Sequence, residues 1–566
     1  MAMPIRPILK IISAPSATIP WPKRGTGKVT KTMMTGGEAV VAALEANGVR
    51  TLYGLPGVQL DHLFNALHGA TDWLRVVNAR HEQGVAYMAL GHAQSTGTPG
   101  VYACVPGPGF LNTTAALSTA YAVHAPVLAL IGQIHSKAIG VGGGELHELP
   151  DQTAIVRGLT RWNGIAHSPE DVPGLMRTAF EMLASGIGPV AVELPADVLA
   201  AHAMMDAAVK AEARPPALPP EHLVASAAHL LIAARRPLIM AGAGAYGGEG
   251  ALARIAERLG APVMMHLQGR GLLESSHPLA IGMGEGRQIW NDADVILAVG
   301  TRFHRLPAEW GLSETQKVVR IDTDPARFTI GRPPEIAIAA DGAAALEAIA
   351  GRLAHLPPRN EAGIAAAAIL KAKTEQRIAI ELAPQMAYLA ALRQALPADA
   401  HIVADYTQIG YMAADRHPVA RPRQMLTPGY QGTLGWAYAT ALGAKSANPD
   451  KVVVALCGDG GFLFTANEMA TAVAHGIAAI GIVFVDGAYG NVQRMQREDH
   501  GGKVIASDLV NPEFERFAES FGAKARRAET ADGLAEALRW AMDQTGPTLI
   551  VAPVPRFPSP WALIEP

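Results

Sequence analysis

The chain is poor in cysteine, because Cys104 and Cys457 are the only two among its 566 residues. Each lies inside an apolar run, which indicates a buried free thiol in a reducing compartment rather than a disulfide. The ligand spacing of a structural zinc site is also missing. We therefore expect a cytoplasmic protein without disulfides and without structural zinc.

Charge of one sign and long apolar runs are lacking too. The formal net charge is −3, only 17% of the residues are charged, and no basic stripe runs through the body of the chain. These features argue against a nucleic-acid partner. No apolar stretch has the length needed to cross a membrane. With 49% hydrophobic residues, the composition is that of a soluble globular protein with an ample core.

Residues 1–33 differ from everything that follows, because they contain no acidic residue and several prolines. Their apolar patch, residues 7–12, is interrupted by Lys10, which argues against a secretory signal. We expect a disordered basic tail or an upstream start, with translation beginning at Met33 or Met34, in preference to a targeting peptide. The basic residues are Arg6, Lys10, Lys23, Arg24, Lys28 and Lys31.

From Thr35 onwards, strand-like and helix-like segments alternate, which predicts α/β domains built on doubly wound parallel sheets. Proline-containing segments at residues 200–220 and around Pro357-Pro358 interrupt this alternation and are typical of linkers. The expected fold is three such domains, at residues 34–199, 221–356 and 371–555. Among the expected elements are strands at Pro237–Ala241, Val295–Val299 and Ile477–Val485, and helices at Phe464–His475 and Lys371–Leu382.

Two polar clusters in the third predicted domain follow strand-like runs. The first is Gly458-Asp459-Gly460-Gly461-Phe462, and the second begins at Asp486, 486 − 459 = 27 residues later. That is about the length of one crossover between neighbouring parallel strands, so both aspartates would lie at the carboxyl edge of the sheet. Glycines allow a diphosphate to approach the backbone, and carboxylates suit Mg²⁺. By itself, Gly-Asp-Gly is more often only a turn.

Together the two clusters resemble the fingerprint of thiamine diphosphate (ThDP) enzymes of the acetolactate synthase, pyruvate oxidase and decarboxylase family. The resemblance implies Mg²⁺ held by the side chains of Asp459 and Asp486 and by the carbonyl of Ala488. The family usually has Asn-Asn where this chain has Val485-Asp486, a change that keeps an oxygen ligand and adds a negative charge. The implied cofactor-binding residues are Pro56, Thr407, Gln408, Gly432, Leu434, Gly458, Asp459, Gly460, Gly461, Tyr489, Gly490 and Asn491.

Three residues are candidates for the chemistry. Glu82 stands where a strand ends and a helix begins, a position where an acid is often only favourable electrostatics. The segment Arg80–Gly84 resembles the one that carries the family's pyrimidine-activating glutamate, and Leu434 would take the place of the residue that bends the cofactor. His124 is either a proton relay or a helix-end histidine with a structural hydrogen bond.

The central domain raises the question of a nucleotide ligand. Gly242, Gly244 and Gly247 fit G-x-G-x-x-G after a strand, but no acidic residue follows at the distance expected for a ribose. Segments that resemble flavin-holding segments of relatives contain Arg302, Asp322 and Asp341. Other relatives bind ADP or nothing there, so the sequence leaves FAD, ADP and no ligand open.

Two segments differ from those of acetolactate synthase, so we expect a broader reaction class than acetolactate synthesis. Leu146-His147-Glu148 replaces its Phe-Gln-Glu, and Met495 stands in a segment that lacks its substrate-selecting tryptophan. We expect a ThDP- and Mg²⁺-dependent lyase or carboligase for a 2-oxo acid or a related diketone. The alternatives are an FAD-containing 2-oxo acid oxidase or decarboxylase and a non-catalytic ThDP-binding protein. The resemblance also implies a homodimer or homotetramer with active sites between subunits.

Overall fold

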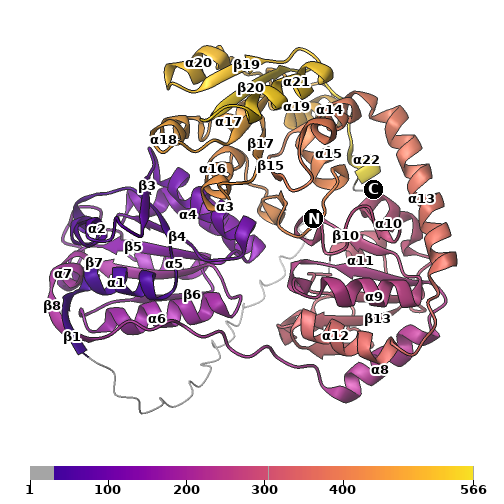
Figure 1. The fold of residues 1–566 in the computed structure, drawn as a ribbon, viewed down its shortest axis with the longest axis horizontal. Helices are drawn as coiled ribbons and strands as arrows, with labels where there is room; N and C mark the ends of the chain where they lie inside the picture. Colours follow the sequence, from indigo (N-terminus) through magenta and orange to yellow (C-terminus); the bar gives the residue numbers. More distant parts are fainter. Residues whose placement is uncertain (1–30, 304, 565–566) are drawn as a thin grey trace, which may run out of the picture.

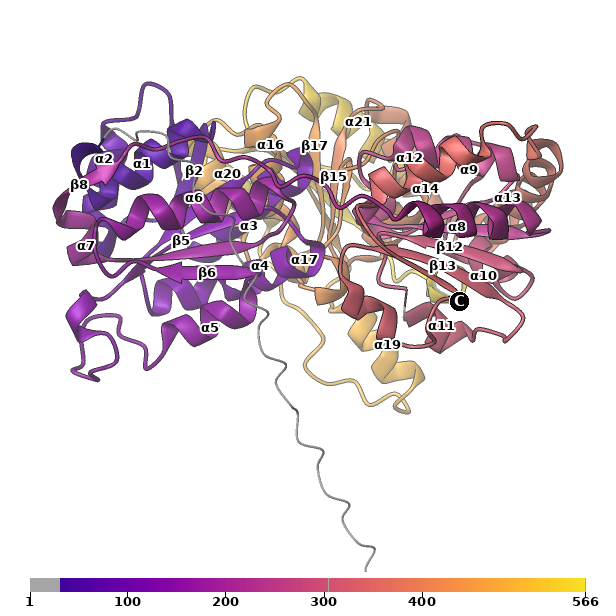
Figure 2. The same ribbon diagram turned by 90° about the horizontal axis from the view of Figure 1, so that it is seen from below.

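The computed structural model describes residues 31–303 and 305–564, and it contains three six-stranded sheets in which every neighbouring pair of strands is parallel. Helices cover the faces of the sheets (Figures 1 and 2). The expected fold class, three doubly wound α/β domains, is confirmed. The proposed boundaries, residues 34–199, 221–356 and 371–555, stay predictions.

The first and third sheets have one architecture. Renumbered within each domain, both have the strand order 2-1-3-4-6-5. The first sheet contains β2 (Thr51–Gly54), β3 (Arg75–Asn78), β4 (Gly100–Cys104), β5 (Val127–Gln133), β6 (Trp162–Ile165) and β7 (Val190–Pro195). The third contains β15 (His401–Ala404), β16 (Met425–Leu426), β17 (Val453–Gly458), β18 (Ile480–Val485), β19 (Lys524–Arg527) and β20 (Thr548–Pro553).

The central sheet has a different order, 3-2-1-4-5-6, which is typical of dinucleotide-binding domains. Two of its strands, β9 (Pro237–Ala241) and β12 (Val295–Val299), have the predicted bounds, and they are adjacent at the point where the strand order reverses. The remaining strands are β10 (Val263–Met265), β11 (Ala280–Ile281), β13 (Lys317–Asp322) and β14 (Ile336–Ala339).

Helices of eight residues or more follow the strands in all three domains. In the first domain they are α1 (Gly36–Ala46), α2 (Asp61–His68), α3 (Glu82–Thr96), α4 (Pro108–Val123), α5 (Gln152–Leu159) and α6 (Asp171–Ala184). The central domain has α8 (Glu221–Ala233), α9 (Glu249–Leu259), α10 (Met283–Trp290) and α12 (Gly342–Leu353). Beyond it are α13 (Asn360–Glu381), α14 (Ala383–Ala395), α15 (Gln408–Arg416), α16 (Ala437–Ala447), α19 (Gly490–Glu498) and α21 (Ala531–Met542).

The first and third domains meet along α3 and α16, which lie beside each other at the junction in Figure 1. Both helices carry a glycine at the crossing. A Cβ added to Gly91 would lie 1.9 Å from the carbonyl oxygen of Thr440, and one added to Gly443 would lie 1.9 Å from that of Met88. The two backbones can therefore be this close only because both positions lack a side chain.

Four sequence predictions need correction: the assignment of two segments and the bounds of two helices. The sequence places residues 31–33 in the tail and residues 202–206 in a linker, but β1 (Lys31–Thr35) and β8 (His202–Asp206) form an antiparallel pair. The pairing partners are far apart in sequence, and the pairing buries Ala203 and Met205. Residues 1–30, the rest of the predicted tail, lie outside the described residues.

The predicted helix Phe464–His475 is shorter in the structure. It consists of a 3-10 turn, η7 (Ala466–Glu468), followed by α18 (Met469–Ala474). Just before the turn, the hydroxyl of Thr465 donates to the carbonyl oxygen of Gly435, which holds the chain in a tertiary contact instead of a helix. The helix predicted at Lys371–Leu382 begins earlier, since α13 starts at Asn360.

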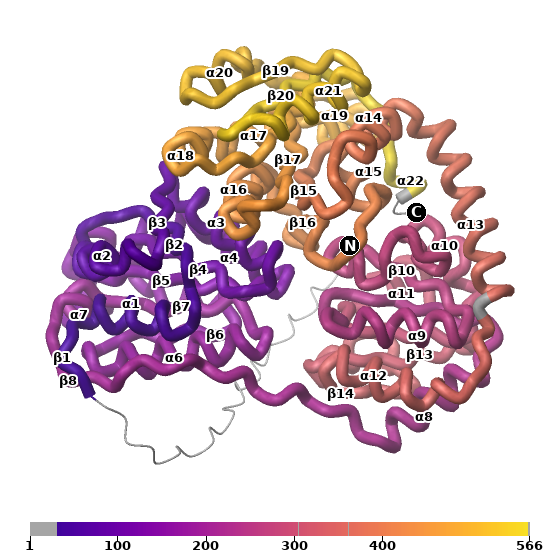
Figure 3. Tube along the Cα trace, in the orientation of Figure 1, coloured from indigo at the N-terminus to yellow at the C-terminus, as the bar shows by residue number. Residues whose placement is uncertain are grey.

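Figure 3 traces how the chain passes between the domains. After β8 an extended segment crosses to the central domain, and α13 returns along the outer side of that domain to the third one. Among the described residues, no helix is both long and apolar enough to span a membrane.

Candidate cofactor site

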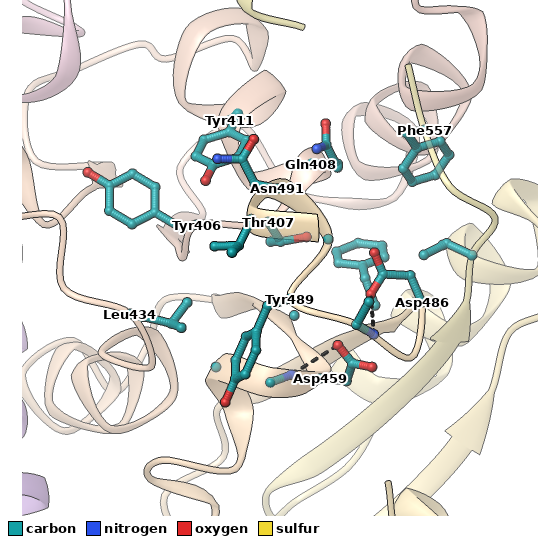
Figure 4. Close-up of a pocket in the computed structure, with 18 residues that line it drawn as sticks. Tyr406, Thr407, Gln408, Tyr411, Leu434, Asp459, Asp486, Tyr489, Asn491 and Phe557 are labelled. Carbon is teal, nitrogen blue, oxygen red and sulfur yellow. Dashed lines mark hydrogen bonds between the residues drawn. The ribbon is translucent and has the colours of Figure 1, made fainter. Parts of the chain in front are cut away.

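A pocket lies at the carboxyl edge of the third sheet (Figure 4). Its position follows from the register of β17 and β18, in which Gly458 is paired with Phe484, so that Asp459 and Asp486 leave the sheet side by side. The cavity measures about 210 Å³. Predicted residues that line it are Thr407, Gln408, Leu434, Gly458, Asp459, Gly460, Gly461, Asp486, Ala488, Tyr489, Gly490 and Asn491.

Three glycines of the pocket have no room for a side chain. A Cβ on Gly460 would lie 2.6 Å from the ring of Tyr489, and one on Gly490 would lie 2.5 Å from Oδ2 of Asp486. A Cβ on Gly461 would lie 2.9 Å from Oδ2 of the buried Asp405. The glycines thus keep the turn backbones close to the acidic side chains and leave the cavity open.

The two pocket aspartates have different partners. Asp459 is buried and accepts hydrogen bonds at both oxygens: from the Gly460 N–H at Oδ1 (2.9 Å), and at Oδ2 from the Gly487 N–H (2.9 Å) and Asn511 Nδ2 (2.7 Å). From the residues that the structure describes, Asp486 accepts only a longer bond, from the N–H of Ala488 to Oδ1 (3.3 Å). Asp459 is therefore fixed by its loops, while Asp486 keeps most of its acceptor capacity.

Burial raises the pKa of Asp459 above its ordinary value. Burial, and then the negative charge of Asp459, raises the pKa of Asp486 from 3.8 to about 6. The shift of Asp459 reflects the cost of taking a carboxylate out of water, and that of Asp486 adds repulsion by the neighbouring carboxylate. A cation between them would remove that cost.

The donor set fits a magnesium-bound diphosphate. Mg²⁺ binds oxygen ligands and takes one or two carboxylates together with substrate phosphates. Among the described residues, no group of three or more His, Cys, Asp or Glu side chains could hold a metal, so a third protein ligand would be an oxygen of another kind, such as the backbone carbonyl of Ala488. The N-termini of α15 and α19 also lie at the pocket and favour an anion there.

Asp405 supports the turn that carries Leu434. It is 2% exposed, and its carboxyl accepts the N–H of Gly435 at Oδ2 (3.1 Å) and that of Tyr406 at Oδ1 (2.8 Å). Burial raises its pKa from 3.8 to about 7. Because Gly435 follows Leu434 directly, this contact holds the turn at the wall of the pocket.

Glu82 lies elsewhere, on the first domain. It is the first residue of α3, and its Oε2 accepts a hydrogen bond from Nδ2 of Asn112, at the start of α4 (3.0 Å). Neither residue lines the pocket of the same chain, and neither does Pro56, which is exposed after β2. The structure therefore shows two separate groups of the predicted residues on one chain.

Three models of one protein family match the chain, one in each of its three domains. Residues 34–155 match the thiamine pyrophosphate enzyme N-terminal TPP binding domain, residues 224–349 the central domain, and residues 405–552 the C-terminal TPP binding domain. The chain belongs to the thiamine pyrophosphate enzyme family. Thiamine pyrophosphate is another name for ThDP.

Similar proteins cover nearly the whole chain. A probable 2-ketoarginine decarboxylase of Pseudomonas aeruginosa is 35% identical over 91% of this chain and 93% of its own length. A probable acetolactate synthase large subunit of Methanocaldococcus jannaschii is 31% identical over 91% of both chains. The large subunit of acetolactate synthase isozyme 1 of Escherichia coli is 29% identical over 92% and 94%.

His124 is far from Glu82 in this thiamine pyrophosphate enzyme. Glu82, the first residue of α3, accepts a hydrogen bond from Asn112 near the beginning of α4, whereas His124 caps the other end of α4. The twelve residues from Asn112 to His124 span roughly 18 Å along the helix. Nε2 of His124 lies 3.4 Å from Arg302, and burial lowers the pKa of the imidazole to about 4. On this chain His124 is thus far from Glu82, and its role as a proton relay stays a prediction.

In the central domain, two glycines of the motif pack closely against the backbone of Gly300. A Cβ on Gly242 would lie 2.5 Å from the carbonyl oxygen of Gly300, and one on Gly244 would lie 2.7 Å from its Cα. Asp341 caps α12 through the N–H of Ala344, and Asp322 accepts the N–H of Asp324 in a local turn. These contacts give Gly242, Gly244, Asp341 and Asp322 structural roles, and a ligand at the motif stays a prediction.

Arg302 is different, because it reaches out of the central domain. Its guanidinium donates to the carbonyl oxygen of Ala122 (2.6 Å) and lies 4.3 Å from the centre of the Tyr430 ring. Arg161 and Arg327 are near enough to lower its pKa, after burial, the largest cause. Three arginines of two domains therefore gather beside the point where the central strand order reverses.

Several residues at the site were not predicted. The wall of the pocket also contains Tyr406, Tyr411, Phe484, Val492, Val554 and Phe557. Asn511, which donates to Asp459, lies 52 residues further along the chain, so no local pattern marks it. Gly432 was predicted but does not line the pocket. It lies beside the ring of Tyr406.

Proposed function

We propose that the chain is a ThDP- and Mg²⁺-dependent lyase or carboligase acting on a 2-oxo acid or a related diketone. The observation that carries this proposal is the pair Asp459 and Asp486 at the ends of adjacent parallel strands, inside a glycine-lined pocket. Bound ThDP would supply an electron sink for breaking a bond next to a carbonyl carbon. The two buried cysteines support a cytoplasmic location.

Within the pocket, each residue has a distinct task in this proposal. Asp459, Asp486 and the carbonyl oxygen of Ala488 would hold Mg²⁺, and the N-terminal N–H groups of α19 would face the diphosphate. Leu434, held by Asp405 through Gly435, would support the bent cofactor from the side. Glu82 would hold the proton at the pyrimidine ring nitrogen.

Because Glu82 does not line its own chain's pocket, we propose that a second copy supplies it. Hydrophobic side chains are exposed near both halves of the site, as expected where another copy covers them. The proposed active unit is therefore a homodimer, alone or within a homotetramer. The exposed residues are Val58, Leu111 and Leu146 on the first domain and Leu463, Phe464, Val492 and Met495 on the third.

The relatives set the range of reactions to test. One is named for decarboxylation of 2-ketoarginine, and others for acetolactate synthesis. Purified protein with ThDP and Mg²⁺ should therefore be offered 2-oxo acids, including 2-ketoarginine and pyruvate, and diketones. Both CO₂ release and coupled products should be measured.

The decisive variant is Glu82→Gln, compared with Glu347→Gln on the exposed face of α12. We expect Glu82→Gln to lower turnover by about 100-fold or more while ThDP still binds, because general acid-base groups contribute about 10²–10⁴. Unchanged turnover in Glu82→Gln would refute the proposed site.

A second candidate is an FAD-containing 2-oxo acid oxidase or decarboxylase. The 3-2-1-4-5-6 strand order and the cluster of Arg161, Arg302 and Arg327 favour an anionic nucleotide between the first and central domains. A yellow protein whose flavin absorbance bleaches on adding substrate would support this candidate, and a colourless protein that releases ADP on denaturation would contradict it.

A further inference from the structure

Glu468 is a buried carboxylate of the third domain that contacts the segment before Glu82. It is 0% exposed and lies at the end of η7, nine residues after Asp459. Its Oε2 accepts the backbone N–H of Arg80 (3.1 Å), and its Oε1 accepts that of His81 (3.1 Å). These are the last two residues before Glu82.

Among the described residues, every hydrogen-bond partner of the Glu468 carboxylate is a donor. Besides the two backbone N–H groups, the hydroxyl of Thr471 donates to Oε2 (2.6 Å) and Nδ2 of Asn467 donates to Oε1 (3.3 Å). An ionised carboxylate accepts at both oxygens, whereas a carboxamide has one acceptor and one donor end. A glutamine here would therefore point an NH₂ group at donors.

Gly84 provides a second, independent sign of this contact. A Cβ on residue 84 would lie 2.3 Å from Oε1 of Glu468. The glycine two residues after Glu82 is thus explained by the carboxylate of the third domain, which occupies the space where a side chain would be.

We propose that Glu468 is a positioning residue that holds the start of α3 and thereby aims the Glu82 side chain. Asn112 holds that side chain at its carboxylate, and Glu468 holds the backbone from which it extends. The inference rests on the proposed role of Glu82. In the proposed dimer, each third domain then binds one cofactor in its pocket and also places the glutamate that serves the partner's pocket.

A mixed dimer separates these two tasks. One tagged chain carries Glu82→Gln and keeps an intact pocket, while a differently tagged chain carries Asp459→Ala and keeps its Glu82. After tandem purification, only one kind of pocket binds ThDP, and it is served by Glu82 of the Asp459→Ala chain. Exchange of the thiazolium C2 proton for deuterium, followed by acid quench and NMR, reports on Glu82 without any substrate.

Glu468→Gln is then added to either chain. In the Asp459→Ala chain it lies beside the working Glu82, and we expect exchange to slow by about 10- to 100-fold, the effect of a misplacement of up to about 1 Å. In the Glu82→Gln chain it lies beside the working pocket, and we expect a change of less than about twofold. Equal effects in both chains, or none in either, would overturn the proposal.

Amide hydrogen exchange of the cofactor-free homodimer tests the contact directly. Glu468→Gln and Gly84→Ala should each speed exchange of Arg80 and His81 at least about tenfold, since both remove the acceptor from these N–H groups, while α6 stays unchanged. Unaltered exchange at residues 80 and 81 would overturn the contact. If Glu468→Gln does not fold, Glu468→Asp takes its place.

This second measurement also separates the two proposals. A mixed dimer without any C2 exchange, before Glu468 is changed, would contradict the shared active site of the proposed function. The amide exchange at residues 80 and 81 would still decide whether Glu468 holds the start of α3.

Discussion

The backbone N–H of Gly487 donates a hydrogen bond to Oδ2 of Asp459 (2.9 Å), which ties the turn after β18 to the carboxylate after β17. Asn511 donates to the same oxygen from a third segment of the chain (2.7 Å). Protein donors thus orient the aspartate. Preorganised ligands of this kind lose less freedom when a metal binds.

Metal removal should release ThDP. With EDTA we expect ThDP affinity to fall by at least about 100-fold and to return with Mg²⁺ or Mn²⁺, since both prefer oxygen ligands.

Asp459→Asn should weaken ThDP binding at saturating Mg²⁺ by a similar factor, because the NH₂ group of the asparagine would face one of the N–H donors that Asp459 now accepts. Asp486→Asn keeps an oxygen ligand and should cost less than about tenfold. Calorimetric titration would measure each affinity, and the reverse order would contradict the assignment.

Asn112→Ala should lower turnover while leaving ThDP affinity nearly unchanged, because Asn112 orients Glu82 and does not line the pocket. We expect a loss of about tenfold in kcat, the scale of one misaligned acid-base group. Thr114→Ala on the same helix is the control, since its hydroxyl bonds only to the carbonyl of Leu111. A large change in ThDP affinity in Asn112→Ala would contradict this assignment.

Gly443→Ala should destabilise the junction between the first and third domains. Its methyl group would meet the backbone of Met88, which cannot move as a flexible side chain can, so we expect a loss of about 3 kcal/mol in the free energy of unfolding. Gly174→Ala, in α6 with no atom within 4 Å of the new Cβ, should be neutral or stabilising by up to about 1 kcal/mol. Denaturant titration compares them, and equal stabilities would contradict the packing argument.

The Asp405 side chain should make stability depend on pH. Burial raises its pKa from 3.8 to about 7, so the native state keeps a proton that the unfolded chain releases near pH 4. Its contribution is present below pH 4 and is lost as the pH rises to 7, by up to about 4 kcal/mol. The difference in unfolding free energy between wild type and Asp405→Asn should therefore shrink or change sign between pH 4 and pH 7. A difference that does not change between pH 4 and 7 would contradict the raised pKa.

The His92 side chain should change stability with pH in the direction opposite to Asp405, over much of the same pH range. Burial lowers its pKa from 6.5 to about 4, so the native state excludes a proton that the unfolded chain binds. Its contribution is present above pH 6.5 and is lost as the pH falls to 4, by up to about 3 kcal/mol. In His92→Asn, acid should therefore destabilise less than in wild type. Melting curves at several pH values measure this, and a parallel acid dependence would be evidence against it.

The sequence by itself determined the parallel sheets and the position of the two aspartates at the edge of the third sheet. Buried parallel strands are nearly continuous apolar runs, and β9 and β12 were predicted with their observed bounds for that reason. The spacing of Asp459 and Asp486 likewise predicted that they would leave neighbouring strands side by side, because a crossover has a limited length.

Only the tertiary structure decided the contacts between distant segments. It paired β1 with β8, shortened the helix after Thr465, and brought Asn511 to Asp459 and Glu468 to Arg80. It also separated His124 from Glu82, two residues that the sequence could not place relative to each other. Local patterns encode which face of an element is buried, whereas the partner of that face is set by how the whole chain packs.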